Sequence, residues 1–145
     1  MQFSLKYKLD ETSHHDANVI NISILQDNII ISFDCGFVSN FESAGPIVMG
    51  ENLLELKFVS KENFYTLENS KRIKIQKPNS LESCIALIAK TKFVQSNEQT
   101  IFTLSGFLEP PLKLYYIEWE ITCKSAELQW NRFIRQEEWI NGASL

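Results

Sequence analysis

The stretch NVINISILQDNIIISFD, residues 18–34, is the strongest indicator of the fold. It consists of two runs rich in isoleucine and valine, separated only by Gln26 and Asp27. β-Branched side chains favour extended strands, and two such runs joined by a short polar turn are typical of a β-hairpin. The sequence therefore predicts an antiparallel hairpin in the N-terminal half of the chain.

Further strands are predicted on both sides of this hairpin. Residues 3–9 alternate apolar and polar side chains, which indicates a strand with one solvent-exposed face. Between the hairpin and the next run, residues 35–51 contain Gly36, Gly45, Pro46 and Gly50 and predict a long loop or an irregular edge. The remaining strand-like runs are NLLELKFVS (52–60), FYTL (64–67), KRIKIQK (71–77), QTIFTLSGFL (99–108) and KLYYIEWEITC (113–123).

Two helices are predicted, one after each group of strands. Asn79 can cap the first, with Glu82 three residues later, and Ser125 can cap a second over residues 126–140 that ends at Asn141 and Gly142. The apolar residues expected to face the core are Leu81, Cys84, Ile85 and Ile88 on the first helix and Ala126, Trp130, Phe133, Ile134 and Ile140 on the second.

The fold class that follows is α+β, with an antiparallel, strongly curved or split β-sheet and two helices in the order strands, helix, strands, helix. The length of 145 residues predicts a single domain, 1–145. A hydrophobic content of 44% and a charged content of 22% are close to globular averages and exclude disordered and low-complexity classes.

The net charge of −4 conceals a strong polarity along the chain. No lysine or arginine occurs from Leu9 to Leu56, whereas residues 57–92 hold eight basic residues against three acidic ones. A mildly acidic chain is a poor candidate for gripping nucleic acid or an anionic membrane, and its acidic segment favours a basic partner. The acidic residues of this segment are Asp10, Glu11, Asp16, Asp27, Asp34, Glu42, Glu51 and Glu55.

The residues do not form a recognisable catalytic or metal-binding motif. The only histidines, His14 and His15, lie in a polar segment, and nothing local marks Cys35 as an activated partner for either. Glu118 and Glu120 share one face of a predicted strand, as a catalytic carboxylate pair would, but they also fit its solvent-exposed side. We expect no enzyme activity, no cofactor and no metal.

The expected location is the cytoplasm, without a membrane anchor. The N-terminal residues lack the apolar run of a secretory signal, and no window approaches the roughly 18 apolar residues of a membrane span. The three cysteines are odd in number and widely spaced, which fits reduced thiols.

Three aromatic residues are candidate interface anchors. Trp139 falls opposite the core stripe of the predicted second helix, so it is either an exposed anchor or tucked under the chain end. Phe37 and Phe41 lie in the predicted loop and either anchor a partner or fill a gap in the core. A basic run, Lys71 to Lys77, either tracks a phosphate backbone or protects an edge strand.

The chain is small and acidic, lacks catalytic residues, has the acidic stretch DETSHHDANVINISILQDNIIISFDCGF (10–37) and is expected to end in a tryptophan-bearing helix. In these features it resembles the immunity proteins of bacterial contact-dependent growth-inhibition systems. The resemblance implies a non-enzymatic protein that binds the toxin domain of its cognate effector. Such toxins are often basic nucleases, including ones similar to ribosomal-RNA-cleaving colicins. The layout of strands and helices also resembles the Whirly single-stranded-DNA-binding fold, an analogy of fold alone.

The functional hypothesis is therefore an immunity protein that binds and neutralises a toxin domain, a basic nuclease, by covering its active site or substrate-binding surface. Nucleic acid and membrane are not expected partners, and the oligomeric state is not predicted. The alternative is a non-catalytic module that binds nucleic acid or a small ligand. The candidate partner-binding residues are Asp10, Glu11, Asp16, Asp27, Asp34, Phe37, Phe41, Glu42 and Trp139.

Overall fold

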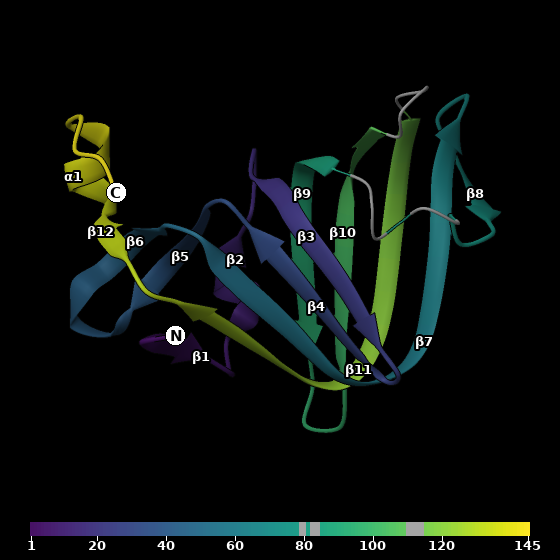
Figure 1. Ribbon diagram of the computed structural model, residues 1–145, viewed down its shortest axis with the longest axis horizontal. Coiled ribbons are helices and arrows are strands. Elements are labelled where there is room, and N and C mark those ends of the chain that lie inside the picture. The colour runs from purple at the N-terminus through teal and green to yellow at the C-terminus, as the bar shows by residue number, and fades with distance from the viewer. Residues whose placement is uncertain (79–80, 82–84, 110–114) are drawn as a thin grey trace.

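The computed structural model describes residues 1–78, 81, 85–109 and 115–145 and shows a protein built almost entirely of antiparallel strands (Figure 1). Its strands form one sheet of eight and one of four, and the described residues contain a single short α-helix. The predicted α+β class with two helices is therefore wrong. No helix in this part of the chain is long and apolar enough to cross a membrane.

Six strands of the larger sheet close into a ring, because β7 pairs with β11 in addition to its neighbour β4. The order around the ring is β11, β10, β9, β3, β4 and β7, while β1 pairs with β11 and β8 pairs with β7. The strands are β1 (Phe3–Leu5), β3 (Asn18–Leu25), β4 (Asn28–Phe33), β7 (Asn52–Glu68), β8 (Lys71–Ile75), β9 (Ile85–Gln95), β10 (Thr100–Glu109) and β11 (Tyr115–Trp130). The predicted hairpin is present as β3 and β4.

The smaller sheet has the order β12-β6-β5-β2 and is formed largely by residues expected to be a loop. Residues 35–51 contain two antiparallel strands. Gly36 begins the first, Gly45 and Pro46 begin the second, and Gly50 follows it. The prediction of a long loop was therefore wrong. The elements of this part are β2 (Thr12–Ser13), β5 (Gly36–Phe41), β6 (Gly45–Met49), β12 (Phe133–Arg135) and the 3₁₀ turns η1 (Leu9–Glu11) and η2 (Glu42–Ala44).

The predicted second helix is mostly strand, because β11 continues through Trp130 and only α1 (Gln136–Ile140) is helical. Ala126, Leu128 and Trp130 are all buried, which is the alternation of a strand. Ala126 and Trp130 are four residues apart and share a face in either structure, so this pair could not distinguish helix from strand. Leu128 is the residue that distinguishes them: a helix would place it on the side opposite Ala126 and Trp130, but it is buried with them, as in a strand.

The predicted first helix is not supported where the structure describes it. Ile85 begins strand β9, which continues to Gln95, and Leu81 is buried. Asn79, Glu82 and Cys84 lie outside the described residues. The strands–helix–strands–helix layout, on which the likeness to the Whirly fold rested, is thus not the layout of this chain.

A bulge bends the two longest strands, β7 and β11, at the same level. Thr122 pairs with Lys61 but Cys123 pairs with Val59, so Ser60 is an extra residue on β7. On β11 the buried positions change from odd to even numbers between Cys123 and Ala126. Figure 1 shows that both strands run from the smaller sheet and curve round to the far side of the ring.

The hydrophobic core is continuous between the two sheets. Trp130 from β11 packs against Phe41 of the smaller sheet, with ring centroids 5.0 Å apart, and Phe3 and Phe133 pack around them. Trp130 is fully buried and Phe41 nearly so. Aromatic pairs in this geometry add to the free energy gained by burial, so this cluster fixes the smaller sheet on the ring.

We expect Leu54→Ala to destabilise the protein by about 2–5 kcal/mol, because it leaves a cavity at the ring closure. Leu54 is 0% exposed and pairs with Ile31 on β4 and with Leu128 on β11. Leu67→Ala on the same strand is the control, since Leu67 is 48% exposed and its loss should cost less than about 1 kcal/mol. Urea denaturation measures both, and equal effects would contradict the role of Leu54.

Candidate functional site

Two of the predicted anchors, Phe37 and Trp139, meet on the outer side of the smaller sheet. Their rings pack edge to face with centroids 5.9 Å apart. Phe37 pairs with Val48, and Val48 pairs with Ile134, so these three side chains share the sheet face that α1 covers. Trp139 is nevertheless 46% exposed, so it both packs on Phe37 and remains available to a partner.

A groove of about 350 Å³ is lined in part by α1 residues that precede and follow Trp139 in the chain. It is formed by the turn between β5 and β6 on one side and by α1 on the other, and Ile140 at its border is among the most exposed apolar residues of the described chain. Phe37, Trp139, Ile140 and the groove together are called the α1 face below. The groove is lined by Ser43, Ala44, Pro46, Arg135, Gln136, Glu137 and Ile140.

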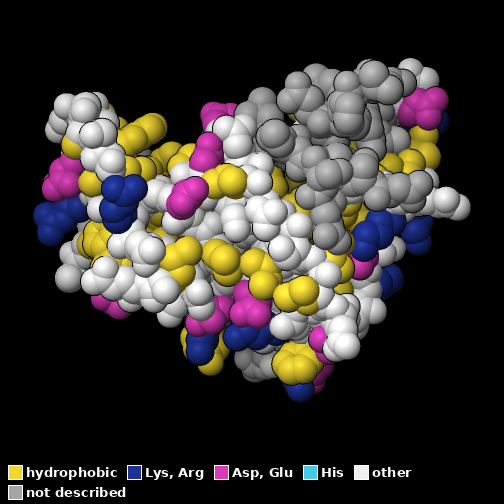
Figure 2. Space-filling model, in the orientation of Figure 1, with side chains coloured by type: hydrophobic (Ala, Val, Ile, Leu, Met, Phe, Trp, Pro, Cys, Tyr) yellow, Lys and Arg dark blue, Asp and Glu magenta, His cyan; other side chains and the backbone are white. Residues whose placement is uncertain are grey.

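Acidic side chains border the α1 face on two sides. Glu42 immediately precedes the groove residues, and Glu137 and Glu138 lie on α1, all three exposed. Asp34 accepts a hydrogen bond from the amide of Asn18 (2.8 Å), two residues after Asp16, so both carboxylates lie at the same end of the β3–β4 hairpin. Figure 2 shows acidic side chains gathered near the start of β3 and the end of β4, with a hollow between them and α1.

The remaining predicted acidic residues lie elsewhere, so the acidic segment is not one continuous patch. Asp27 occupies the turn between β3 and β4, at the opposite end of β4 from Asp34, and its carbonyl accepts a hydrogen bond from the Val59 amide (2.7 Å). Asp10 and Glu11 lie in η1, which packs against β9 and β5. Only part of the acidic segment therefore contributes its charge to the surroundings of α1.

Phe41, the third predicted anchor, fills the core. It is buried against Trp130 and Phe133 and offers almost no surface to a partner. Of the two interpretations left open for Phe37 and Phe41, the core interpretation holds for Phe41, whereas Phe37 supports the exposed ring of Trp139.

His14 is a buried structural residue. Its Nε2 donates to Oδ1 of Asn52 (2.8 Å), its Nδ1 lies 3.3 Å from the Thr91 hydroxyl, and its ring stacks on Phe33. A side chain at Gly36 would come within 3.1 Å of this ring, which explains the glycine there. Burial lowers the pKa of His14 to about 4, so the ring is neutral at physiological pH.

Cys35 shows no sign of activation as a nucleophile. Burial, together with the neighbouring Asp34 carboxylate, raises the pKa of its thiol to about 11. Since the thiolate is the reactive form of cysteine, this environment opposes nucleophilic chemistry. The described residues also contain no group of three or more histidine, cysteine, aspartate or glutamate side chains placed to hold a metal ion.

The candidate carboxylate pair is neutralised by one residue of the basic run, Arg72. Arg72 of β8 forms ion pairs with Glu118 (2.8 Å) and Glu120 (3.6 Å), and its guanidinium lies 3.6 Å from the centre of the Tyr65 ring. Lys77 pairs with Glu62 (3.5 Å). β8 is an edge strand of the sheet, so its basic residues fit the edge-protecting interpretation.

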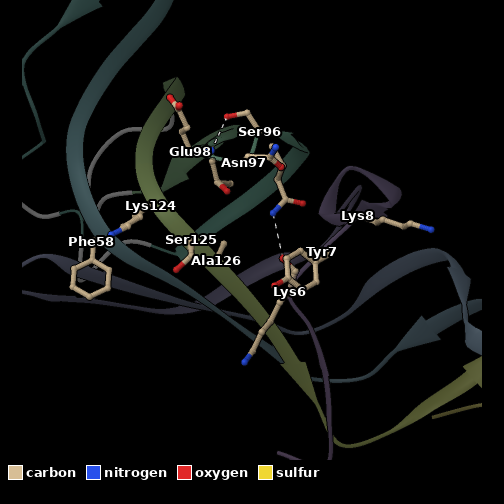
Figure 3. A pocket seen from close by; sticks show the side chains of 12 residues that line it. Lys6, Tyr7, Lys8, Phe58, Ser96, Asn97, Glu98, Lys124, Ser125 and Ala126 are labelled. Atoms are coloured by element: carbon tan, nitrogen blue, oxygen red, sulfur yellow. Dashed lines mark hydrogen bonds between the residues drawn. The ribbon is translucent and has the colours of Figure 1, made fainter.

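A second concave surface, not singled out from the sequence, lies at the bulge of β7 and β11. It is a cleft of about 740 Å³ with three lysines and two exposed aromatic rings on its walls (Figure 3). The run Lys6-Tyr7-Lys8 could have indicated this cleft from the sequence. Phe58 and Lys124 are far from this run in the sequence and are brought to the same cleft only by the tertiary fold. The lining residues are Lys6, Tyr7, Lys8, Phe58, Gln95, Ser96, Asn97, Glu98, Thr100, Lys124, Ser125 and Ala126.

Comparison of the chain with models of protein families, with characterised proteins and with solved structures gave no match.

We expect stability to fall on acidification because of His14. Its folded pKa of about 4 lies below the value of 6.5 for an unperturbed histidine, so protonation favours the unfolded chain. The stabilisation of the folded chain by neutral His14 is fully present above pH 6.5. This stabilisation, about 3 kcal/mol, is lost as the pH falls toward 4.

Urea denaturation across this pH range tests the expectation by comparing the wild type with His14→Gln. The variant should be less stable near neutral pH, and its free energy of unfolding should fall less on acidification. The control is Leu67→Ala, at an exposed position without a titratable group, which should keep the wild-type pH dependence. If the wild type and both variants lose stability in parallel, the assignment to His14 is wrong.

Proposed function

We propose that this chain is an immunity-type protein that binds and neutralises a toxin domain, a basic nuclease, through the α1 face. The observation that carries the proposal is the meeting of Phe37 and Trp139, from distant parts of the chain, at an exposed surface beside a groove. Large aromatic side chains contribute most of the binding energy in many protein interfaces.

The α1 face combines an aromatic anchor, Trp139, with the groove beside α1. Trp139 is held by Phe37 but keeps almost half of its surface exposed, so a partner can bury it with little further loss of side-chain freedom. Ile140 and the groove beside it extend the apolar area next to the tryptophan. A projecting apolar side chain of the partner fits this recess.

The charges around the α1 face favour a basic partner. Asp16, Asp34 and Glu42 are exposed, and α1 adds Glu137 and Glu138, whereas Arg135 supplies the opposite charge within the groove lining. Complementary charge of this kind accelerates encounter and disfavours acidic partners. The substrate surface of a nuclease is basic because it binds phosphates, and it is therefore a suitable target.

The mechanism proposed is stoichiometric exclusion of substrate. The α1 face docks over the active site or the substrate-binding surface of the toxin, and RNA or DNA can no longer reach it. His14 and Cys35 need no chemical role in this mechanism. The alternative in which Lys71 to Lys77 binds nucleic acid has less support, because Arg72 and Lys77 are paired with carboxylates of the same chain.

Trp139→Ala should weaken the complex with the toxin domain encoded beside this gene by at least about 2 kcal/mol, roughly 30-fold in Kd. Titration calorimetry measures the binding, and survival of toxin-expressing cells measures protection. The matched control is Phe107→Ala, which removes an exposed aromatic ring on β10. Absence of a complex, or a tight complex that gives no protection, would contradict the proposal.

Neutralising the acidic border should slow association and reduce its dependence on salt. The variant is Asp16→Asn with Glu42→Gln, and stopped-flow association at several salt concentrations gives the rate. Asp10→Asn with Asp27→Asn is the control, because it removes the same two charges from η1 and from the far end of β4. An equal effect of the control would show that total charge acts rather than the α1 face.

A further inference from the structure

The cleft in Figure 3 is assembled from four separate segments of the chain. The segment before η1 supplies Lys6, Tyr7 and Lys8, and the turn between β9 and β10 supplies residues 96–98. Phe58 comes from β7, and Lys124 comes from β11 beside it. Phe58 and Lys124 both lie next to the bulge that bends these two strands.

Phe58 is held in an unusual backbone conformation that exposes its ring. Its φ of 56° lies in the left-handed region, which is unfavourable for a bulky side chain. The Phe58 amide donates to Oδ1 of Asn28 (3.2 Å), and the next amide donates to the Asp27 carbonyl (2.7 Å). These bonds from the β3–β4 turn fix the conformation, and the ring remains 58% exposed.

Tyr7 is fixed on another wall of the cleft through its neighbours. The Gln95 side chain accepts a hydrogen bond from the Leu9 amide (2.9 Å) and donates one to the Lys6 carbonyl (3.3 Å). The backbone on both sides of Tyr7 is thus bound to β9, while the Tyr7 side chain is 79% exposed. Two aromatic rings are therefore presented to solvent from a fixed backbone.

The turn between β9 and β10 is also ordered by its own hydrogen bonds. The Ser96 amide donates to the Gln99 carbonyl (2.9 Å), and the Ser96 hydroxyl accepts from the amides of Glu98 (3.4 Å) and Gln99 (3.3 Å). This turn places the Asn97 amide side chain at the cleft, where it offers hydrogen bonds to a polar ligand (Figure 3).

The charge of the cleft is positive although the chain as a whole is acidic. Its lining contains three lysines and one carboxylate, Glu98. Lys6 is paired with Glu127 (3.7 Å), but Lys8 and Lys124 form no ion pair with the residues that the structure describes. Lys124 instead lies 5.8 Å from the centre of the Phe58 ring, so its charge stays available next to an aromatic surface.

We propose that this cleft binds a nucleotide, with its phosphate near the lysine of one wall, Lys8 or Lys124, and its base against Tyr7 or Phe58. Lysines alone would suit any anion, but two exposed aromatic rings beside them match the combination of phosphate and stacking base. The nucleotide can be free or part of a single strand. This site is separate from the α1 face and does not depend on the proposed toxin binding.

The test measures binding of the purified chain to a fluorescein-labelled single-stranded RNA of about ten nucleotides and, separately, to ATP. Fluorescence anisotropy is used for the RNA and calorimetry for ATP. Lys8→Gln with Lys124→Gln should weaken binding. For the RNA, the slope of the logarithm of the binding constant against the logarithm of salt concentration should become shallower by about 0.7 per lysine removed. Tyr7→Ala or Phe58→Ala should weaken binding about fivefold or more.

Matched controls use residues of the same kind outside the cleft. Lys71→Gln with Lys74→Gln removes two exposed charges from β8, and Phe107→Ala removes an exposed ring from β10. Neither should change binding, and thermal melting confirms that all variants fold. RNA binding much stronger than ATP binding identifies a single strand as the ligand, and similar values identify a free nucleotide.

Three results would overturn the proposal. The first is that neither probe binds. The second is equal weakening by the β8 control, which would show attraction by overall charge alone. The third is competition by polyglutamate as effective as competition by unlabelled RNA, which would show that the base is not recognised.

Discussion

The pairing of β7 with β11 is the constraint on which the rest of the structure depends. Twelve residue pairs join these two strands, from Asn52 opposite Trp130 to Tyr65 opposite Glu118. β4 pairs with the first part of β7, and β10 pairs with the first part of β11, so the ladder closes the ring. Without it, the edges of both long strands would expose unpaired backbone groups, which is costly when they are buried.

The same pairing also positions both candidate binding surfaces. At one end, Trp130 carries the aromatic cluster with Phe41 and Phe133 that holds the smaller sheet, and the smaller sheet in turn supports α1. In the middle, the bulge breaks the alternation of both strands and turns Phe58 and Lys124 toward solvent. Without the bulge, side chains would alternate regularly along both strands, and one face would stay apolar throughout. Phe58 and Lys124 would then not reach a common cleft.

Sequence patterns predicted the strands well where the alternation was regular and failed where it was not. The β3–β4 hairpin was predicted because β-branched residues flank a two-residue polar turn. β11 was predicted only as far as Cys123, since the bulge shifts the buried positions by one residue and the following segment then imitates a helix. Residues 35–51 were predicted as a long loop or an irregular edge because their glycines and proline weaken the strand pattern, although pairing with β2 and β12 stabilises them as strands.

The sequence by itself determined the chemical character of this chain: many β-branched and aromatic residues, an acidic N-terminal segment without basic residues, and three candidate anchors. Only the tertiary structure decided which of these act together. It buried Phe41, joined Phe37 to Trp139, divided the acidic residues between separate places and gathered Lys8, Phe58 and Lys124 around one cleft. The physical reason is that contacts between distant segments depend on strand register and on bulges, and a shift of one residue reverses the side on which a side chain lies.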